Sequence, residues 1–247
     1  MYRYQILVEY ASLPKFVGWQ KQSKGKSIQK EIEKILTKLL KQKTIIYAAG
    51  RTDKSVASLG QSAHFDTNFK IKEINKFIKS LNFFLNPKKI SIINIIKRNK
   101  NFHARYSAKE RVYKYFIINR LANPVLEYER AWHIRKKLDI KLLKEGAKKL
   151  VGTHDFSTMR AKNCYAKSPI KKMNKITVKN INNKIQIEFR SKSFLRNQVR
   201  SMVGCLKKLA EKKWDMKKFE YVFKSKKRSK CAQPAPAHGL YLAKVIY

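Results

Sequence analysis

The fold is decided at the start of the chain by an alternating stretch, Tyr2-Arg3-Tyr4-Gln5-Ile6-Leu7-Val8-Glu9-Tyr10. Its apolar and aromatic side chains recur at every second residue, which places Tyr4, Ile6, Val8 and Tyr10 on one face of a strand. Ser27 follows as a plausible helix N-cap, and apolar residues then recur at helical spacing through residue 39. The chain therefore opens with a strand and an amphipathic helix.

The next segments complete one structural unit. An apolar stretch over residues 44–49 predicts a strand, a polar break covers 51–55, and a second strand is expected near 61–67. A helix is predicted over about 72–85, where Asn86-Pro87 ends it, and a β-branched strand over 90–96. The predicted order is β-α-β-β-α-β.

The same order can be assigned a second time. The expected elements are strands at 111–119, 176–179, 185–189 and 240–245, and helices at about 140–150, 194–212 and 216–223. Asn99-Lys100-Asn101 interrupts the apolar pattern between the two halves. We expect an α+β protein with two tandem ferredoxin-like halves, residues 1–104 and 105–247, whose antiparallel sheets join around a central basic cleft.

Charge is the strongest compositional signal. The 247 residues include 58 Lys plus Arg against 16 Asp plus Glu, a formal net charge of +42, while 43% of residues are apolar. The apolar content excludes a disordered basic tail, and the charge favours a polyanion such as RNA as partner. No apolar stretch is long enough to span a membrane and the first residues lack the apolar core of a signal peptide, so we expect a soluble, cytoplasmic protein.

Metal chemistry has little support in the sequence. Cys164, Cys205 and Cys231 fit no zinc or redox spacing and are interpreted as ordinary thiols. The five histidines are scattered, and no two of them lie four residues apart. No helix-turn-helix or zinc-finger pattern favours a DNA-binding protein either.

One polar stretch between two expected strands, Gly50-Arg51-Thr52-Asp53, could carry chemistry. On propensity alone, a surface Arg-x-Asp pair or an Asx-turn explains it. The stretch nevertheless resembles the active-site signature of the TruA-type tRNA pseudouridine synthases. Further segments resemble the same family in order and spacing: Gly18-Trp19-Gln20, Phe102 to Ala108 with Tyr113-Lys114-Tyr115, Leu150 to Ser157, Phe194 to Gly204, and Ala235 to Leu242.

The resemblance implies an isomerase that converts uridine to pseudouridine at positions 38–40 of the tRNA anticodon stem and loop. It implies no cofactor, tRNA as the macromolecular partner and a homodimer. Asp53 would be the catalytic carboxylate, acting either through a covalent adduct or by removing a sugar proton. Either variant needs an ionised Asp53, and Arg200 would be the cation that keeps it charged.

Three further roles follow from the same resemblance. Arg51 would occupy the gap left by the extruded uridine, because a stacked base cannot reach the catalytic group. Tyr113 would be a further catalytic residue that stacks on the target uracil and helps with the C5 proton, although Tyr115 on the same strand face is equally aromatic. Leu240 would close the other side of the pocket.

The sequence departs from the family directly after Asp53. The family usually has Ala-Gly-Val-His-Ala there, whereas this chain has Lys54-Ser55-Val56-Ala57-Ser58. If the backbone at Ser55 still needs a positive φ, the missing glycine leaves local strain. An RNA-binding or RNA-chaperone protein that kept the fold and lost activity is the alternative interpretation.

Overall fold

The computed structural model describes residues 1–247, which form two compact units. Unit 1 comprises Met1–Lys109 and Tyr241–Tyr247, and unit 2 comprises Glu110–Leu240. Together the units contain ten strands and five α-helices, so the chain is a mixed α+β protein, as expected. No helix has the length and apolar character needed to cross a membrane.

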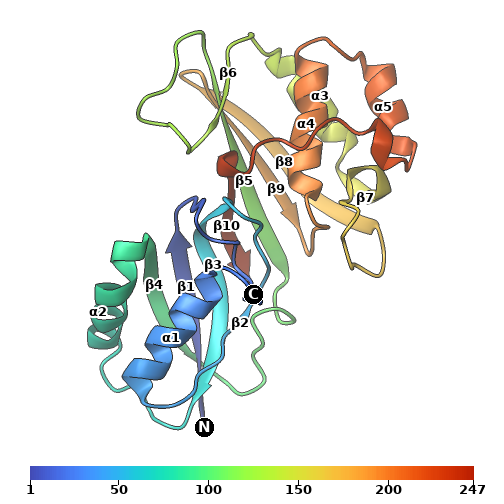
Figure 1. Ribbon diagram of the computed structural model, residues 1–247. Helices are drawn as coiled ribbons and strands as arrows, with labels where there is room; N and C mark the ends of the chain where they lie inside the picture. Colours follow the sequence, from blue (N-terminus) through green and yellow to red (C-terminus); the bar gives the residue numbers. More distant parts are fainter. The chain divides into compact units, whose positions relative to one another are not determined.

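Unit 1 contains two α-helices and an antiparallel set of strands. Its elements are β1 (Tyr2–Tyr10), α1 (Ile28–Leu40), β2 (Tyr47–Ala48), β3 (Ala57–Thr67), α2 (Ile74–Leu85), β4 (Ile90–Arg98) and, from Tyr241 onward, β10 (Leu240–Ile246). The strand order is β4-β1-β3, with β2 antiparallel to β3 and β10 parallel to the first residues of β3. Figure 1 shows α1 and α2 beside this sheet.

The core of unit 1 follows the predicted periodicity. Tyr4, Ile6, Val8 and Tyr10 of β1 are all at most 2% exposed and pack with the buried faces of both helices. The Ser27 hydroxyl accepts a hydrogen bond from Lys30 N at 3.2 Å, which confirms the predicted N-cap. Helix α2 ends before a short 3-10 turn, Asn86–Lys88, at the proline that was expected to stop it.

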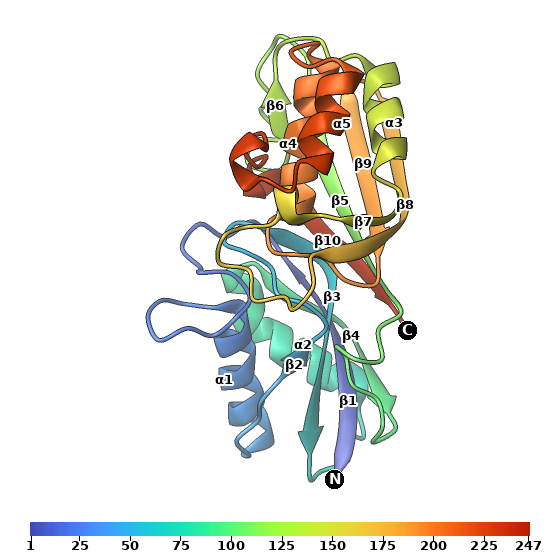
Figure 2. The ribbon, with the colours of Figure 1, turned by 90° about the vertical axis from the view of Figure 1, so that its right-hand side faces the viewer.

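Unit 2 places three α-helices against one side of an antiparallel sheet (Figure 2). Its elements are β5 (Glu110–Asn119), β6 (Trp132–Ile134), α3 (Ile140–Lys149), β7 (Gly152–Asp155), β8 (Ile170–Ile181), β9 (Lys184–Ser191), α4 (Gln198–Ala210) and α5 (Met216–Lys224). The strand order is β5-β9-β8-β7, and β6 pairs with β5 in parallel. Helix α3 packs on α4, α5 and β8.

Side chains replace the expected backbone partners in the segment 44–49, so the strand predicted there was too long. The strand predicted over 44–49 is reduced to β2. Thr44 N donates to Thr37 Oγ1 and Ile46 N donates to Glu33 Oε1, both at 3.1 Å. These two amides therefore bond to helix side chains instead of extending the sheet.

The helix predicted from residue 194 begins only at Gln198. Asn197 has φ 61, and Leu195 N donates to Gln198 Oε1 at 2.8 Å, so the preceding residues form a loop. Strands β6 and β7 were not predicted, and β3 and β8 begin earlier than expected. The division into domains at residues 104 and 105 stays a prediction.

Candidate active site

The Asp53 loop, residues 50–56, connects β2 to β3 in unit 1. Arg51 is exposed and Asp53 half-buried, whereas Thr52 between them is only 6% exposed. The Thr52 hydroxyl is 2.9 Å from the Tyr10 hydroxyl, and Val56 N donates to Asp53 O at 3.2 Å. The loop is thus anchored at Thr52 and turns immediately after Asp53.

Two neighbouring segments brace the backbone of the Asp53 loop. Trp19 N donates to Thr52 O at 3.2 Å, and Gln61 Nε2 donates to Gly50 O at 2.8 Å. Gly18 has φ +110, and a Cβ built on it would lie 2.6 Å from Thr52 O. Only glycine fits that approach without strain, so Gly18 allows the chain to pass directly beside Asp53.

The altered part of the loop has a positive φ at Ser55, which the sequence had left open. Ser55 has φ 62, a left-handed conformation that glycine adopts without strain and serine does not. At this position the chain therefore differs from the family pattern in its side chain, while the backbone has a positive φ. Lys54, beside it, is exposed.

Arg200 lies on the first turn of α4 in unit 2, where its side chain is tied down. Its Nε donates to Ala235 O at 2.6 Å, while Ala235 N donates to Arg200 O at 2.9 Å. Its Nη1 also donates to Asn197 Oδ1 at 3.4 Å. We call Asn197 and the segment Gln233–Ala235 the Arg200 anchor, because these residues fix the direction of the guanidinium.

Gly204 allows the anchor to lie against α4. A Cβ on Gly204 would lie 2.1 Å from Gln233 O, a backbone atom that no side-chain rotation can move away. Both residues belong to unit 2. The glycine therefore serves close packing one turn beyond Arg200.

Tyr113 and Tyr115 lie on the same face of β5 but differ in their surroundings. Tyr115 is 0% exposed, its hydroxyl donates to Pro236 O at 2.8 Å, and burial raises its pKa. Tyr113 is 9% exposed and meets the Phe194 ring edge-on, with centroids 5.0 Å apart. Tyr115 is thus a core residue, which leaves Tyr113 as the better candidate for contact with a base.

Leu240 stands at the start of β10 and is 6% exposed. Of the predicted site residues, Arg51 and Asp53 belong to unit 1, and Tyr113, Arg200 and Leu240 belong to unit 2. Sequence reasoning did not find the roles of Gln61, Ala235 and Gly204. Their contacts join residues far apart in the chain, so no local pattern indicated them.

One further polar residue, His64, has a structural role. His64 is 1% exposed and accepts a hydrogen bond from Ala104 N at 3.2 Å, and burial, aided by the nearby His103, lowers its pKa to about 4. The ring is therefore neutral at neutral pH and holds the Phe102–Ala108 motif in unit 1. No group of three or more His, Cys, Asp or Glu side chains lies close enough together to hold a metal ion.

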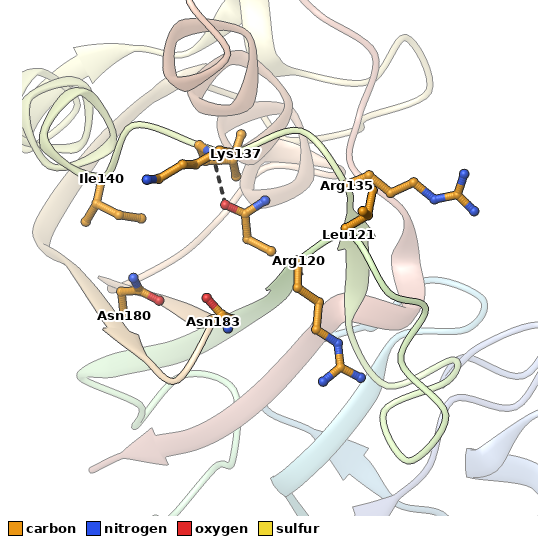
Figure 3. Close-up of a pocket in the computed structure, with 9 residues that line it drawn as sticks. Arg120, Leu121, Arg135, Lys137, Ile140, Asn180 and Asn183 are labelled. Atoms are coloured by element: carbon orange, nitrogen blue, oxygen red, sulfur yellow. Dashed lines mark hydrogen bonds between the residues drawn. The ribbon is translucent and has the colours of Figure 1, made fainter.

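A pocket in unit 2, drawn in Figure 3, contains none of the predicted site residues. Asn119 is one of the residues that line it; its Oδ1 accepts from Leu138 N at 2.9 Å and its Nδ2 donates to Ile134 O and Lys136 O, both at 2.8 Å. The amide thus fixes the connection between β6 and α3. This arrangement is explained by structure alone.

Comparisons with known proteins agree with the motifs. A family model described as tRNA pseudouridine synthase matches residues 147–247. The chain is 60% identical over 247 residues to tRNA pseudouridine synthase A of Pelagibacter ubique, with 100% of both chains covered. It is 41% identical to the protein of that name from Paramagnetospirillum magneticum, covering 100% of this chain and 96% of the relative. It is 39% identical to the one from Parvibaculum lavamentivorans, with 100% of both covered.

Proposed function

The chain belongs to the tRNA pseudouridine synthase family, and on that premise we propose that it isomerises uridine to pseudouridine at positions 38–40 of the tRNA anticodon stem and loop. The observation that carries the proposal is 60% identity over the full length to a tRNA pseudouridine synthase A. An inactive RNA-binding protein finds no support among the relatives, which are named as synthases.

The reaction changes the uracil atom that is bonded to C1′ of the ribose. The N1–C1′ glycosidic bond breaks, the freed uracil rotates, and a C5–C1′ bond forms while the C5 proton is lost and N1 gains one. No group is added and no electron is exchanged with another molecule. The chemistry therefore needs a positioned carboxylate and a base-binding pocket, and calls for no cofactor.

We assign the carboxylate to Asp53. It is half-buried at a turn whose backbone is held on both sides, so a substrate can reach it while its position stays fixed. Its ionised form attacks C1′ or removes a sugar proton, and both variants remain open. Arg200 is assigned as the cation that favours this ionised form, and its anchored guanidinium suits a fixed direction toward a carboxylate.

The remaining assignments concern the extruded nucleotide. Arg51, exposed on the Asp53 loop, takes the place of the uridine that leaves the stack. Tyr113 stacks on the uracil, and Leu240 packs against its other face. Lys54 is exposed three residues after Arg51 on the same loop and is assigned to the RNA backbone.

At the level of architecture, we propose ferredoxin-like topology for both halves and a homodimer. For the first half, support comes from the order β4-β1-β3-β2 and from the two helices packed on one sheet face. The homodimer rests on the family resemblance alone. Light scattering of the purified protein tests it, and a monomer at micromolar concentration would contradict it.

The direct test of the proposed function uses the wild-type protein and unmodified tRNA transcripts without any added cofactor. Pseudouridine should appear within the anticodon stem and loop at positions 38–40, mapped nucleotide by nucleotide. A transcript with cytidine at those positions is the matched control and should remain unmodified. Absence of pseudouridine from every transcript, or its appearance only outside this region, would contradict the proposal.

The charge of +42 leads to a prediction about binding. Because each neutralised phosphate contributes about 0.7–0.9 to the slope of log affinity against log salt, tRNA binding should show a slope of magnitude at least ~4. A filter-binding series over several salt concentrations measures it. A slope near zero would mean that the lysine excess does not contact RNA.

A further inference from the structure

Two cysteines far apart in the sequence meet in unit 2. Cys205 Sγ on α4 lies 3.5 Å from Cys231 Sγ, which follows the short 3-10 turn Arg228–Lys230. Both are free thiols; Cys205 is 1% exposed, whereas Cys231 is half-buried. The sequence indicated no redox spacing because the fold, and not a local motif, brings the two sulfurs together.

The surroundings make the two thiols unequal. Arg228 Nη1 donates to Ser201 Oγ at 2.9 Å and to Thr158 O at 3.4 Å, which holds the guanidinium close to the pair. The contact with Cys205, together with Arg228 and Ser201, lowers the pKa of the Cys231 thiol against the opposing effect of burial. The contact with Cys231 and burial raise the pKa of the Cys205 thiol. A half-buried thiol with a lowered pKa thus contacts a buried thiol with a raised pKa.

We propose that Cys231 and Cys205 form a thiol–disulfide exchange site for low-molecular-weight disulfides of the glutathione class. The half-buried Cys231 thiolate attacks one sulfur of the small disulfide, forms a mixed disulfide and expels one thiolate. Cys205 then loses its proton, and its sulfur attacks Cys231 Sγ and expels the second thiolate. Two protein thiols are oxidised to one disulfide, and the small disulfide is reduced to two thiols.

The location gives the bond a structural consequence. Cys231 leads directly into the segment Gln233–Ala235, whose Ala235 O accepts from Arg200 Nε. The proposed disulfide would link this segment covalently to the helix that carries Arg200. Because the bond closes a loop in the unfolded chain, the oxidised protein should melt at a higher temperature than the reduced protein.

The test incubates the reduced full-length protein with oxidised glutathione and follows intact mass, peptide maps and melting temperature. We expect a loss of two hydrogen atoms, a peptide pair joined through Cys205 and Cys231, a raised Tm, and full reversal by dithiothreitol. Cys164 is an internal control, because its Sγ accepts a hydrogen bond from Arg196 N at 3.4 Å in place of a contact with another thiol. It should form at most a glutathione adduct.

Two variants separate the steps. Cys205→Ala should stop the reaction at a glutathione adduct on Cys231, and Cys231→Ser should leave Cys205 unreacted in the folded protein. Circular dichroism confirms that each variant is folded before the reaction is measured. Glutathione adducts without the internal disulfide in the wild type, or equal reactivity of Cys205 in Cys231→Ser, would overturn the proposal.

Discussion

The Asp53 loop and the start of α4 hold their functional side chains in opposite ways. In the Asp53 loop the backbone is fixed: Thr52 O and Gly50 O accept hydrogen bonds from neighbouring segments. On α4 the side chain itself is fixed, because Arg200 Nε donates to Ala235 O at 2.6 Å. The loop thus holds Asp53 through its backbone, whereas the helix holds Arg200 through its own guanidinium.

The two regions should also respond differently to substitution. The loop after Asp53 departs from the family in several side chains, yet it has a turn at Asp53 and a positive φ at Ser55. The α4 region depends on atomic fit between Gly204 and the backbone of Gln233. Changes in the loop should therefore act mainly through backbone conformation, and changes on α4 through packing.

The largest stability effect is expected at α4. Gly204→Ala places a Cβ at 2.1 Å from Gln233 O, so the anchor segment must move away from the helix. We expect a loss of about 3 kcal/mol in unfolding free energy, despite the better helix propensity of alanine. Urea denaturation measures it.

Gly146→Ala on α3 is the matched control for this prediction. Its Cβ would lie 2.6 Å from Leu209 Cδ2, a side-chain atom that can shift, so the loss should be smaller. If Gly204→Ala is as stable as the wild type, close packing does not hold the Arg200 anchor.

A smaller loss of stability, joined to a loss of turnover, is expected at Gly18. Gly18→Ala forces an L-residue to φ +110 and brings its Cβ to 2.6 Å from Thr52 O. We expect about 1–2 kcal/mol of destabilisation together with a clear fall in kcat, because the residue after Thr52 is Asp53. Thermal melts and single-turnover assays measure the two effects.

Gly25→Ala is the control that distinguishes backbone strain at a positive φ from contact with the Asp53 loop. Gly25 has φ +92, but its Cβ would meet Val17 Cγ1 instead of the Asp53 loop. This variant should lose stability and keep the wild-type kcat when folded. An equal fall in kcat for both variants would show that Gly18 has no specific relation to Asp53.

The smallest effect is expected at Ser55. Because Ser55 has φ 62, Ser55→Gly removes backbone strain that offsets the extra unfolded-state entropy of glycine. Unfolding free energy should therefore stay within about 0.5 kcal/mol of the wild type or rise. Ser23→Gly, at an exposed position without a positive φ, is the control and should lose roughly 0.5–1 kcal/mol. Equal losses in both variants would refute strain at Ser55.

The elements with a clear period could be predicted from the sequence. The alternation in β1 and the Ser27 cap of α1 are local, so neighbouring residues specify them. Strand β7 could not be predicted, because its four residues depend on pairing with β8. The first turn of the helix predicted from Phe194 was wrong because Asn197 takes a left-handed conformation there.

For the candidate site, the motif resemblance indicated the functional residues. The contacts that hold these residues in place became known only from the fold. The missing glycine drew attention to the backbone at Ser55 and is a local signal, but the sequence left the sign of φ open and the structure gives φ 62. The bonds of Gln61 to Gly50 O and of Arg200 to Ala235 O, and the contact of Cys205 with Cys231, join distant segments. No spacing in the sequence encodes them.

Asp53→Asn is the most direct test of whether Asp53 is the catalytic carboxylate. Pseudouridine formation in an anticodon stem-loop should fall below about 1% of the wild-type rate, because losing a covalent or base catalyst costs several kcal/mol in the barrier. Affinity for tRNA should stay within about fivefold, since one carboxylate contributes little beside many phosphate contacts. Residual turnover above about 1%, in a variant that binds tRNA normally, would contradict the account.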